Sequence, residues 1–147
     1  MAETIDPHWM ATVSHDEPRI AVEELRRNRE SGSDRCFFGW RIKNLTEQPI
    51  KFLAARCPHG KFRSGEKIFN PPLYAAAGEN ATIEMPVLCN EPAGTIVENA
   101  FLILLVEWLE NSWRLFVRFR VTINEKGEPE TATELITTQR AGFSGAG

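Results

Sequence analysis

The stretch FLILLVEWLENSWRLFVRFRVTI, residues 101–123, decides the fold, because the rest of the chain can be interpreted as packing around it. Its second half alternates strictly, with an apolar side chain at every second position from Trp113 to Ile123. Alternate residues of a β-strand share one face, so this pattern indicates a strand with one buried side. The sequence therefore predicts two long strands joined by a short turn at Asn111 and Ser112.

A turn at this place predicts which side chains meet across the hairpin. Trp108 would lie opposite Leu115, and Leu104 opposite Phe119, on a continuous core face. Shifting the turn by one residue would exchange the faces and bury three arginines, which costs too much free energy. The other side of the hairpin is called the outer hairpin face below, and it carries Phe101, Ile103, Leu105, Glu107, Leu109, Arg114, Phe116, Arg118 and Arg120. Glu107 is predicted to lie between Arg114 and Arg118, close enough for ion pairing.

The outer hairpin face is the functional candidate, because its apolar side chains form a patch larger than monomers usually expose. Each is worth about 1.5–3 kcal/mol when fully buried. The interspersed arginines suit an interface, where arginine is enriched at binding hot spots. Two kinds of cover remain open. The chain's own arm could supply it with Trp9 and Met10, or its tail with Leu135 and Ile136; otherwise a protein partner or a second copy would.

Length and composition predict a single globular domain. The chain has 147 residues, 42% of them hydrophobic and 25% charged, with a net charge of −3. Basic residues around Phe62 and Phe69 would suit single-stranded nucleic acid, but the acidic total favours a solvated basic edge. The start of the chain lacks the basic cluster and apolar run of a signal peptide. We therefore expect a cytoplasmic protein with no membrane span and no nucleic-acid partner.

The remaining sequence predicts short strands separated by turns. Residues 1–17 are interpreted as an extended arm, 18–123 as the folded domain and 124–147 as a polar, mobile tail. Pro18 opens an ambiguous segment, 18–29, which we interpret as a strand although a helix is the alternative. Residues 57–72 are interpreted as a long connection rich in Gly, Pro and charge. The other predicted strands before the hairpin are 36–44, 50–56, 73–74 and 82–87.

Three segments resemble a known fold. GWRIKNLTEQPIKFLAA (39–55) looks like the strand–Asn–turn–Pro–strand unit of immunoglobulin-like sandwiches of the major-sperm-protein, PapD and ASH kind. PPLYAAAGENATIEMPV (71–87) and EPAGTIVENAFLILLV (91–106) are similar to the units that follow. The resemblance implies an all-β, immunoglobulin-like antiparallel β-sandwich of about seven strands that binds other proteins. The hairpin is more apolar than that pattern, and no residues match a peptide-binding site, so no binding positions are transferred.

The sequence offers few groups for a catalytic or metal site. Cys57, His59 and Cys89 could supply three metal ligands, with His8, His15 or Cys36 as a fourth. Zinc sites normally contain paired clips such as Cys-x-x-Cys, and this sequence has none. A loop histidine and buried thiols are the simpler interpretation. No nucleophile, base and oxyanion site converge in the sequence, so we expect neither an enzyme nor a cofactor.

Together these patterns predict a cytoplasmic, non-catalytic module that binds proteins or assembles a complex through the outer hairpin face. One alternative is a metal- or thiol-dependent protein that uses Cys57, His59 and Cys89. Another is a structural protein that associates with itself through the same face.

Overall fold

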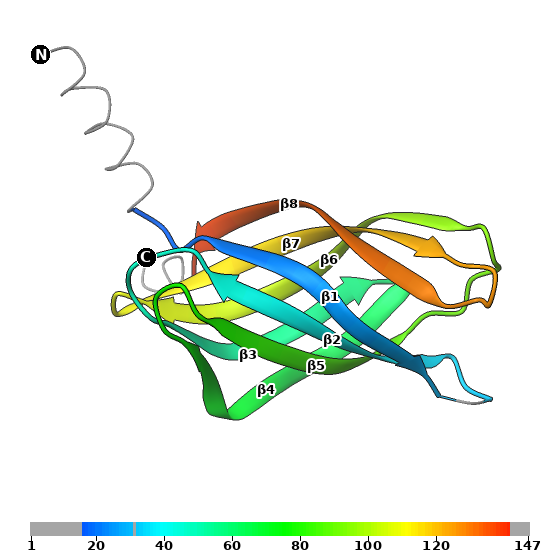
Figure 1. The fold of residues 1–147 in the computed structure, drawn as a ribbon, viewed down its shortest axis with the longest axis horizontal. Helices are drawn as coiled ribbons and strands as arrows, with labels where there is room; N and C mark the ends of the chain where they lie inside the picture. Colours follow the sequence, from blue (N-terminus) through cyan, green and yellow to red (C-terminus); the bar gives the residue numbers. More distant parts are fainter. Residues whose placement is uncertain (1–15, 31, 142–147) are drawn as a thin grey trace, which may run out of the picture.

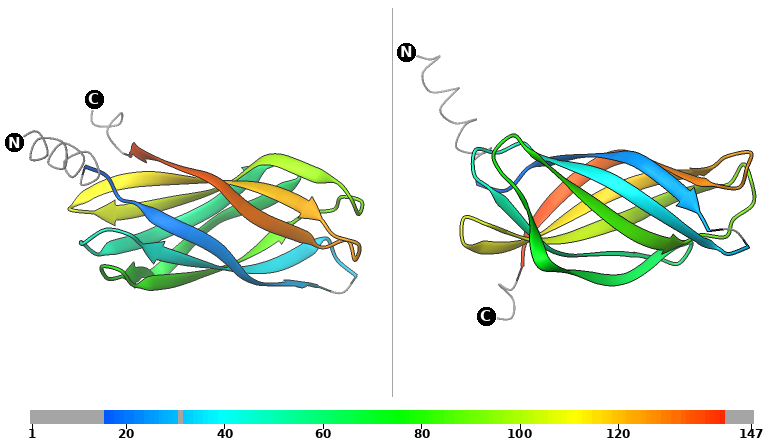
Figure 2. Two further views of the ribbon diagram at one scale, coloured as in Figure 1. Left: turned by 45° about the horizontal axis from the view of Figure 1, so that its top comes forward. Right: turned by 60° about the horizontal axis from the view of Figure 1, so that its bottom comes forward.

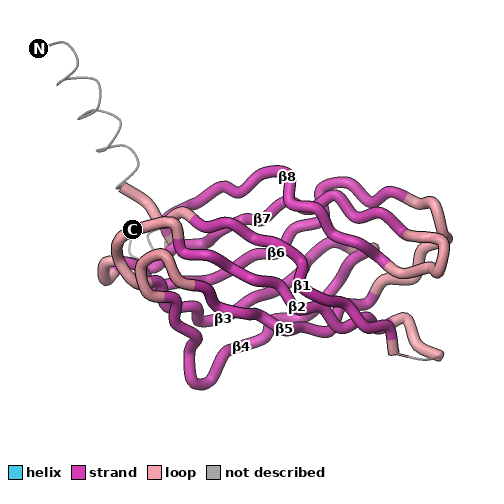
Figure 3. The backbone as a smooth tube through the Cα atoms, viewed as in Figure 1, coloured by secondary structure: helices cyan, strands magenta, loops and turns pink. Residues whose placement is uncertain are grey.

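The fold is entirely β in the part of the chain that the structure covers. The computed structural model describes residues 16–30 and 32–141, which contain no helix. Figure 1 and Figure 3 show long strands that run along one common axis. The strands are β1 (Ile20–Arg29), β2 (Arg35–Asn44), β3 (Ile50–His59), β4 (Phe62–Ala75), β5 (Asn80–Leu88), β6 (Ile96–Trp108), β7 (Asn111–Ile123) and β8 (Pro129–Arg140).

All eight strands belong to one antiparallel sheet in the order β1-β2-β5-β4-β3-β6-β7-β8. The sheet curls until its two end strands, β1 and β8, come side by side, so that the molecule is a nearly closed barrel (Figures 1 and 2). No backbone ladder joins β1 to β8 in the described chain, and side chains bridge them instead. The β4–β5 contact is also thin, with Arg63 opposite Leu88 as its one ladder pair.

The centre of the barrel is aromatic. Trp40 stacks on Phe38 at a centroid distance of 5.0 Å and on Phe119 at 5.4 Å. Phe62 meets Phe38 edge to face at 5.4 Å. These rings come from β2, β4 and β7, so they join strands from opposite sides of the barrel. Inward residues of every strand complete this core, as the alternating pattern of the sequence predicts.

A buried asparagine organises the turn between β2 and β3. Asn44 is fully buried, and its Nδ2 donates to the carbonyls of Gln48 at 2.7 Å and Ala75 at 3.0 Å. Its Oδ1 accepts from the backbone N–H of Thr46 at 2.8 Å and from its hydroxyl at 2.7 Å. A polar group can be buried without a large cost only when it is bonded in this way.

Several strands lie where the sequence predicts them, and three regions differ. The ambiguous segment 18–29 is strand β1, as preferred over a helix. The predicted connection 57–72 is wrong, because β3 continues to His59 and β4 already begins at Phe62. Pro71 and Pro72 argued against a strand there. They are tolerated because they lie where the β3–β4 pairing is interrupted, between Ile68 and Leu73, and because β4 has almost no ladder to β5.

The predicted mobile tail also contains a strand. Residues Pro129–Arg140 form β8, which pairs with β7 along its whole length. This strand is the eighth, against about seven expected. The threonines of this segment could have indicated the strand, because β-branched residues are enriched in strands.

The hairpin of β6 and β7 is present, but its turn and its pairing differ from the prediction. The turn consists of Leu109 and Glu110, with φ values of 49° and 65°. Two positive φ values in a two-residue loop define a type I′ turn, and the predicted position at Asn111-Ser112 is wrong by two residues. Leu104 therefore lies opposite Leu115 and not opposite Phe119. The shift is even, so each side chain keeps its predicted face.

Candidate functional site: the outer hairpin face

The outer hairpin face lies on the outside of the barrel, where β6 and β7 run between β3 and β8 (Figure 2). Phe101 pairs with Arg118, Ile103 with Phe116 and Leu105 with Arg114 across the two strands. Eight of the nine predicted site residues therefore share this surface; Leu109 does not. It belongs to the turn at the end of the hairpin and is 50% exposed.

The apolar centre of the face is less exposed than the sequence suggested. Ile103 is only 8% exposed, although it lies on the outside of the barrel. Phe101 and Phe116 meet edge to face at a centroid distance of 6.4 Å and are half-buried, as is Leu105. These side chains shield one another within one layer, so the broad wet patch expected from the sequence is a narrower apolar strip.

The tail that was expected as a cover flanks the face. Strand β8 extends the sheet beside β7, with Leu135 next to Arg118 and Thr137 next to Phe116. Leu135 remains 47% exposed. The alternative cover, an arm anchored by Trp9 and Met10, lies outside the described residues.

The ion pairs on this face differ from the prediction. Glu107 lies opposite Ser112 and pairs with Lys51 of β3 at 3.3 Å, and not with Arg114 or Arg118. The hydrogen bond to Glu107 raises the pKa of Lys51. Arg118 instead approaches Glu134 of β8 with a nitrogen–oxygen distance of 3.8 Å. Its Nε is buried and makes no hydrogen bond within the described chain.

Arg120 is engaged in a similar way. Its Nε lies 3.8 Å from a carboxylate oxygen of Glu98 at the start of β6. Both groups are about half exposed, so the pair contributes little to stability. Its effect is to neutralise one end of the face.

A small hollow lies beside the apolar strip. It has a volume of about 90 Å³ and is lined by Ala54, Ala55, Arg56, Glu66, Ile103, Leu105 and Arg114. Neither Arg56 nor Arg114 makes an ion pair within residues 16–30 and 32–141. The sequence did not reveal this hollow, because Arg56 is brought to the hairpin by the β3–β6 pairing.

The alternative metal site is not assembled by the fold. In the described ranges no three His, Cys, Asp or Glu residues come together to hold a metal ion. Cys57 and Cys89 are buried and free, while His59 accepts a hydrogen bond from the Lys61 backbone at the end of β3. Burial raises the pKa of the Cys57 thiol to about 12 and that of Cys89 to about 11. Protonated, buried thiols are poor metal ligands and poor nucleophiles. Of the suggested fourth ligands, Cys36 is also buried, and His8 and His15 lie outside the described residues.

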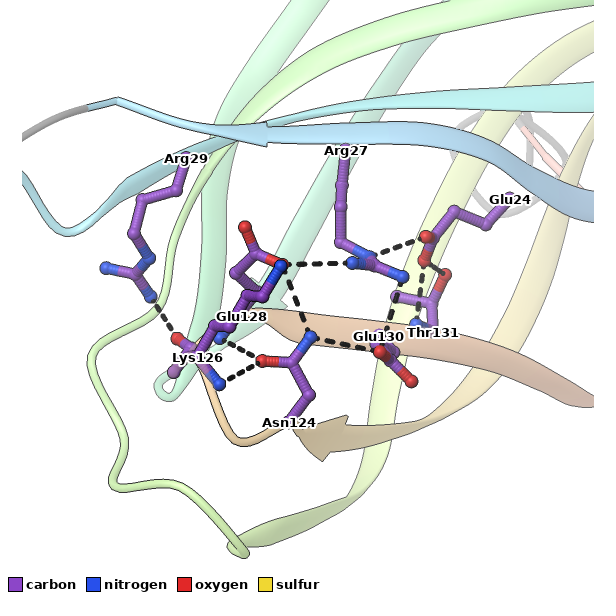
Figure 4. A network of polar contacts seen from close by, with 9 residues as sticks. Glu24, Arg27, Arg29, Asn124, Lys126, Glu128, Glu130 and Thr131 are labelled. Carbon is purple, nitrogen blue, oxygen red and sulfur yellow. Dashed lines mark hydrogen bonds and ion pairs between the residues drawn. The ribbon is translucent and has the colours of Figure 1, made fainter.

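A second polar cluster, which the sequence did not predict, joins β1 to β8 (Figure 4). Glu24 accepts hydrogen bonds from the backbone N–H and the hydroxyl of Thr131, each at 2.8 Å, through one oxygen. Its other oxygen accepts from Arg27 Nε at 2.8 Å. Arg27 also approaches Glu128 at 3.2 Å and Glu130 at 3.4 Å. We call these five residues the seam cluster.

The seam cluster follows from an irregularity in β1. The pairing of β1 with β2 shifts between Glu24 and Arg26, which leaves Leu25 as an extra residue. Glu24 lies opposite Trp40 and Arg27 opposite Phe38, so both charged residues take positions on the core side. Charged side chains that point inward are a known protection of edge strands. We interpret the cluster as structural, because its groups bond one another across the gap in the barrel.

Comparison with protein-family models and with curated proteins found no match to this chain. In residues 16–30 and 32–141 no helix has the length and apolar character needed to cross a membrane.

Proposed function

We propose that this chain is a cytoplasmic, non-catalytic module that binds another protein, or assembles a complex, through the outer hairpin face. The observation that carries the proposal is the apolar strip of Phe101, Ile103 and Phe116. Beside it lie Arg56 and Arg114, which make no ion pair in the described part of the chain. An apolar centre with arginine at its margin is typical of protein interfaces.

The strand order supports a finer description of the fold. An immunoglobulin constant-type sandwich has strands ABED in one sheet and CFG in the other. Lettered along the chain, β1-β2-β5-β4 is the first set and β3-β6-β7 the second. We infer an immunoglobulin-like sandwich in which β4 also pairs with β3 and in which β8 extends the second sheet. The outer hairpin face is then the outside of the CFG sheet.

Binding would combine burial and charge. Phe101 and Phe116 are half-buried, so a partner would remove their remaining apolar surface from water, at about 25 cal/mol per Å². Arg114 is exposed and presents a forked donor to carboxylates or carbonyls of the partner. Its apolar stem can lie against the strip while the charged group stays at the rim.

The test is site-specific cross-linking in the native cell. A photoreactive amino acid at Phe116 should give a discrete cross-linked partner, and the same residue at Phe37 should not. Phe37 is a matched control, because it is an aromatic residue of strand β2, 41% exposed, outside the outer hairpin face. Adding Arg114→Glu should abolish the cross-link while the protein still melts cooperatively. Equal cross-linking from both positions would refute the proposed surface.

Self-association is the second candidate, favoured by the edge of β8. Residues 135–139, LITTQ, carry no charge and no proline, and β8 is an end strand of the sheet. Such an edge is open to pairing with another strand. Thr137→Pro should remove that pairing. Sedimentation of the wild-type chain as a monomer at every concentration would eliminate this candidate and leave the first.

A further inference from the structure

The hollow beside Leu105 forms because Ala54, which has a short side chain, lies among residues with long side chains. Ala54 of β3 lies opposite Leu105 of β6, and Arg56 lies opposite Ile103. On the other side of β6, Arg114 of β7 lies opposite Leu105. The two arginines therefore stand on opposite flanks of β6, with the methyl group of Ala54 leaving space between them.

The hollow has an excess of positive charge over an apolar floor. Its charged lining consists of Arg56 and Arg114 against one carboxylate, Glu66 of β4. Glu66 is exposed and makes no ion pair with either arginine in the described residues. The nearby carboxylates of Glu107 and Glu134 are already paired, with Lys51 and Arg118. Glu66 thus offsets the charge of at most one of the two arginines, and the described lining keeps a positive excess.

The size of the hollow limits what it can take. A volume of about 90 Å³ equals roughly three water molecules at about 30 Å³ each. Sites for drug-sized ligands and cofactors measure about 300–1,000 Å³. One short side chain therefore fits the space, and a cofactor does not.

Resting on the proposed function, we infer that the hollow receives the carboxylate of an aspartate or glutamate on the partner protein. Guanidinium groups bind carboxylates through paired, charge-assisted hydrogen bonds. Apolar residues beside that acid would lie on Phe101 and Phe116, which border the same surface. The partner segment is therefore an acidic residue with apolar neighbours.

A nucleic acid fits this surface less well. Its phosphates form a continuous negative chain that needs a broad positive field. The outer hairpin face contains Glu107 and is flanked by Glu98 and Glu134, and the whole chain carries a net charge of −3. A single carboxylate needs only the two arginines, while a longer polyanion would meet these acids.

The test selects short random peptides by display on the full chain and measures their affinity as synthetic peptides. The selected peptides should contain Asp or Glu next to apolar residues. Changing that acid to Asn or Gln should weaken binding about 10- to 100-fold, because a hydrogen bond to a charged group is lost. Arg114→Gln and Ala54→Leu should weaken binding of the acidic peptide similarly, and Glu66→Gln should strengthen it.

Arg41→Gln is the matched control, because Arg41 is an exposed arginine of β2 outside the outer hairpin face. It should leave the affinity unchanged. Arg114 is exposed, so Arg114→Gln keeps the test decisive if Ala54→Leu fails to fold.

The outcomes separate the two proposals. In one outcome, Phe116→Asp abolishes binding, but neither the change of the peptide's acid nor Ala54→Leu weakens it. This outcome would overturn the present inference and leave the proposed function standing. Peptides indifferent to both variants would overturn both. In another outcome, oligothymidylate displaces the peptide from the wild-type chain but not from Arg114→Gln. This outcome would refute the carboxylate as the ligand of the hollow and favour a polyanion.

Discussion

Glu24 joins the two end strands of the barrel, β1 and β8. It accepts two hydrogen bonds from Thr131 at 2.8 Å each and one from Arg27 at 2.8 Å, and its side chain is only 13% exposed. Glu24→Ala removes all three bonds and leaves the Thr131 N–H without its acceptor. Each bond to a charged group contributes about 1.5–3 kcal/mol, and a buried pair that loses one partner costs about 3–5 kcal/mol.

Arg27 reduces this cost, since it keeps Glu128 and Glu130 as partners. We therefore expect Glu24→Ala to lower the free energy of unfolding by about 3 kcal/mol. For a chain of this size, that lowers Tm by roughly 6–12 °C. Trp40 reports the change by fluorescence, because its Nε1 donates to the hydroxyl of Thr131 at 3.1 Å.

Glu23→Ala provides the matched control. Glu23 neighbours Glu24 in the sequence, but its carboxylate is 61% exposed and pairs with Arg41 at the surface. Exposed pairs contribute about 0–1 kcal/mol, so Tm should fall by at most about 4 °C. Hydrogen exchange of the Thr131 amide should accelerate in Glu24→Ala and not in Glu23→Ala. Equal loss of stability in the two variants would refute the role assigned to the seam cluster.

Three further predictions concern single sites. Glu110→Gly should stabilise the hairpin by roughly 0.5–1 kcal/mol in chemical denaturation, because Glu110 has a φ of 65° that glycine adopts without strain, whereas Glu110→Ala should bring no gain. Asn44→Ala should destabilise by roughly 3 kcal/mol, because it leaves the backbone N–H of Thr46 without its acceptor and removes the amide that donates to the carbonyls of Gln48 and Ala75; a midpoint equal to wild type would contradict this. Cys57 should make stability fall as the pH rises from 9 to 12, because its pKa of about 12 in the native state exceeds the value of 9.0 when exposed. Below pH 9 its contribution to stability is constant. Cys57→Ala should flatten this dependence of stability on pH and leave only the part that Cys89 contributes.

The sequence alone predicts the faces of the hairpin correctly. Trp113, Leu115 and Val117 are buried, as their alternation indicates, and Arg114 and Phe116 between them lie on the outer face. This prediction is safe because the orientation of side chains along a strand is a local property with a period of two. The same pattern cannot distinguish registers that differ by an even number, so the turn at Leu109 was missed.

The candidate site was predicted in part, for the same reason. Phe101, Ile103 and Phe116 do share the outer hairpin face, but their exposure depends on neighbours in β3 and β8. The hollow needs Arg56 and Arg114, which are far apart in the chain and meet only through β6. No local pattern contains that pairing.

What the sequence by itself determined is the all-β character of the chain and the set of side chains that face its core. The tertiary structure decided the order of the strands, the place of β8 and the closure of the barrel. The physical reason is visible at Glu24 and Thr131, which bond at 2.8 Å across a sequence separation of 107 residues. Burial along a strand is set by immediate neighbours, whereas closure depends on distant edges that only the folded sheet brings together.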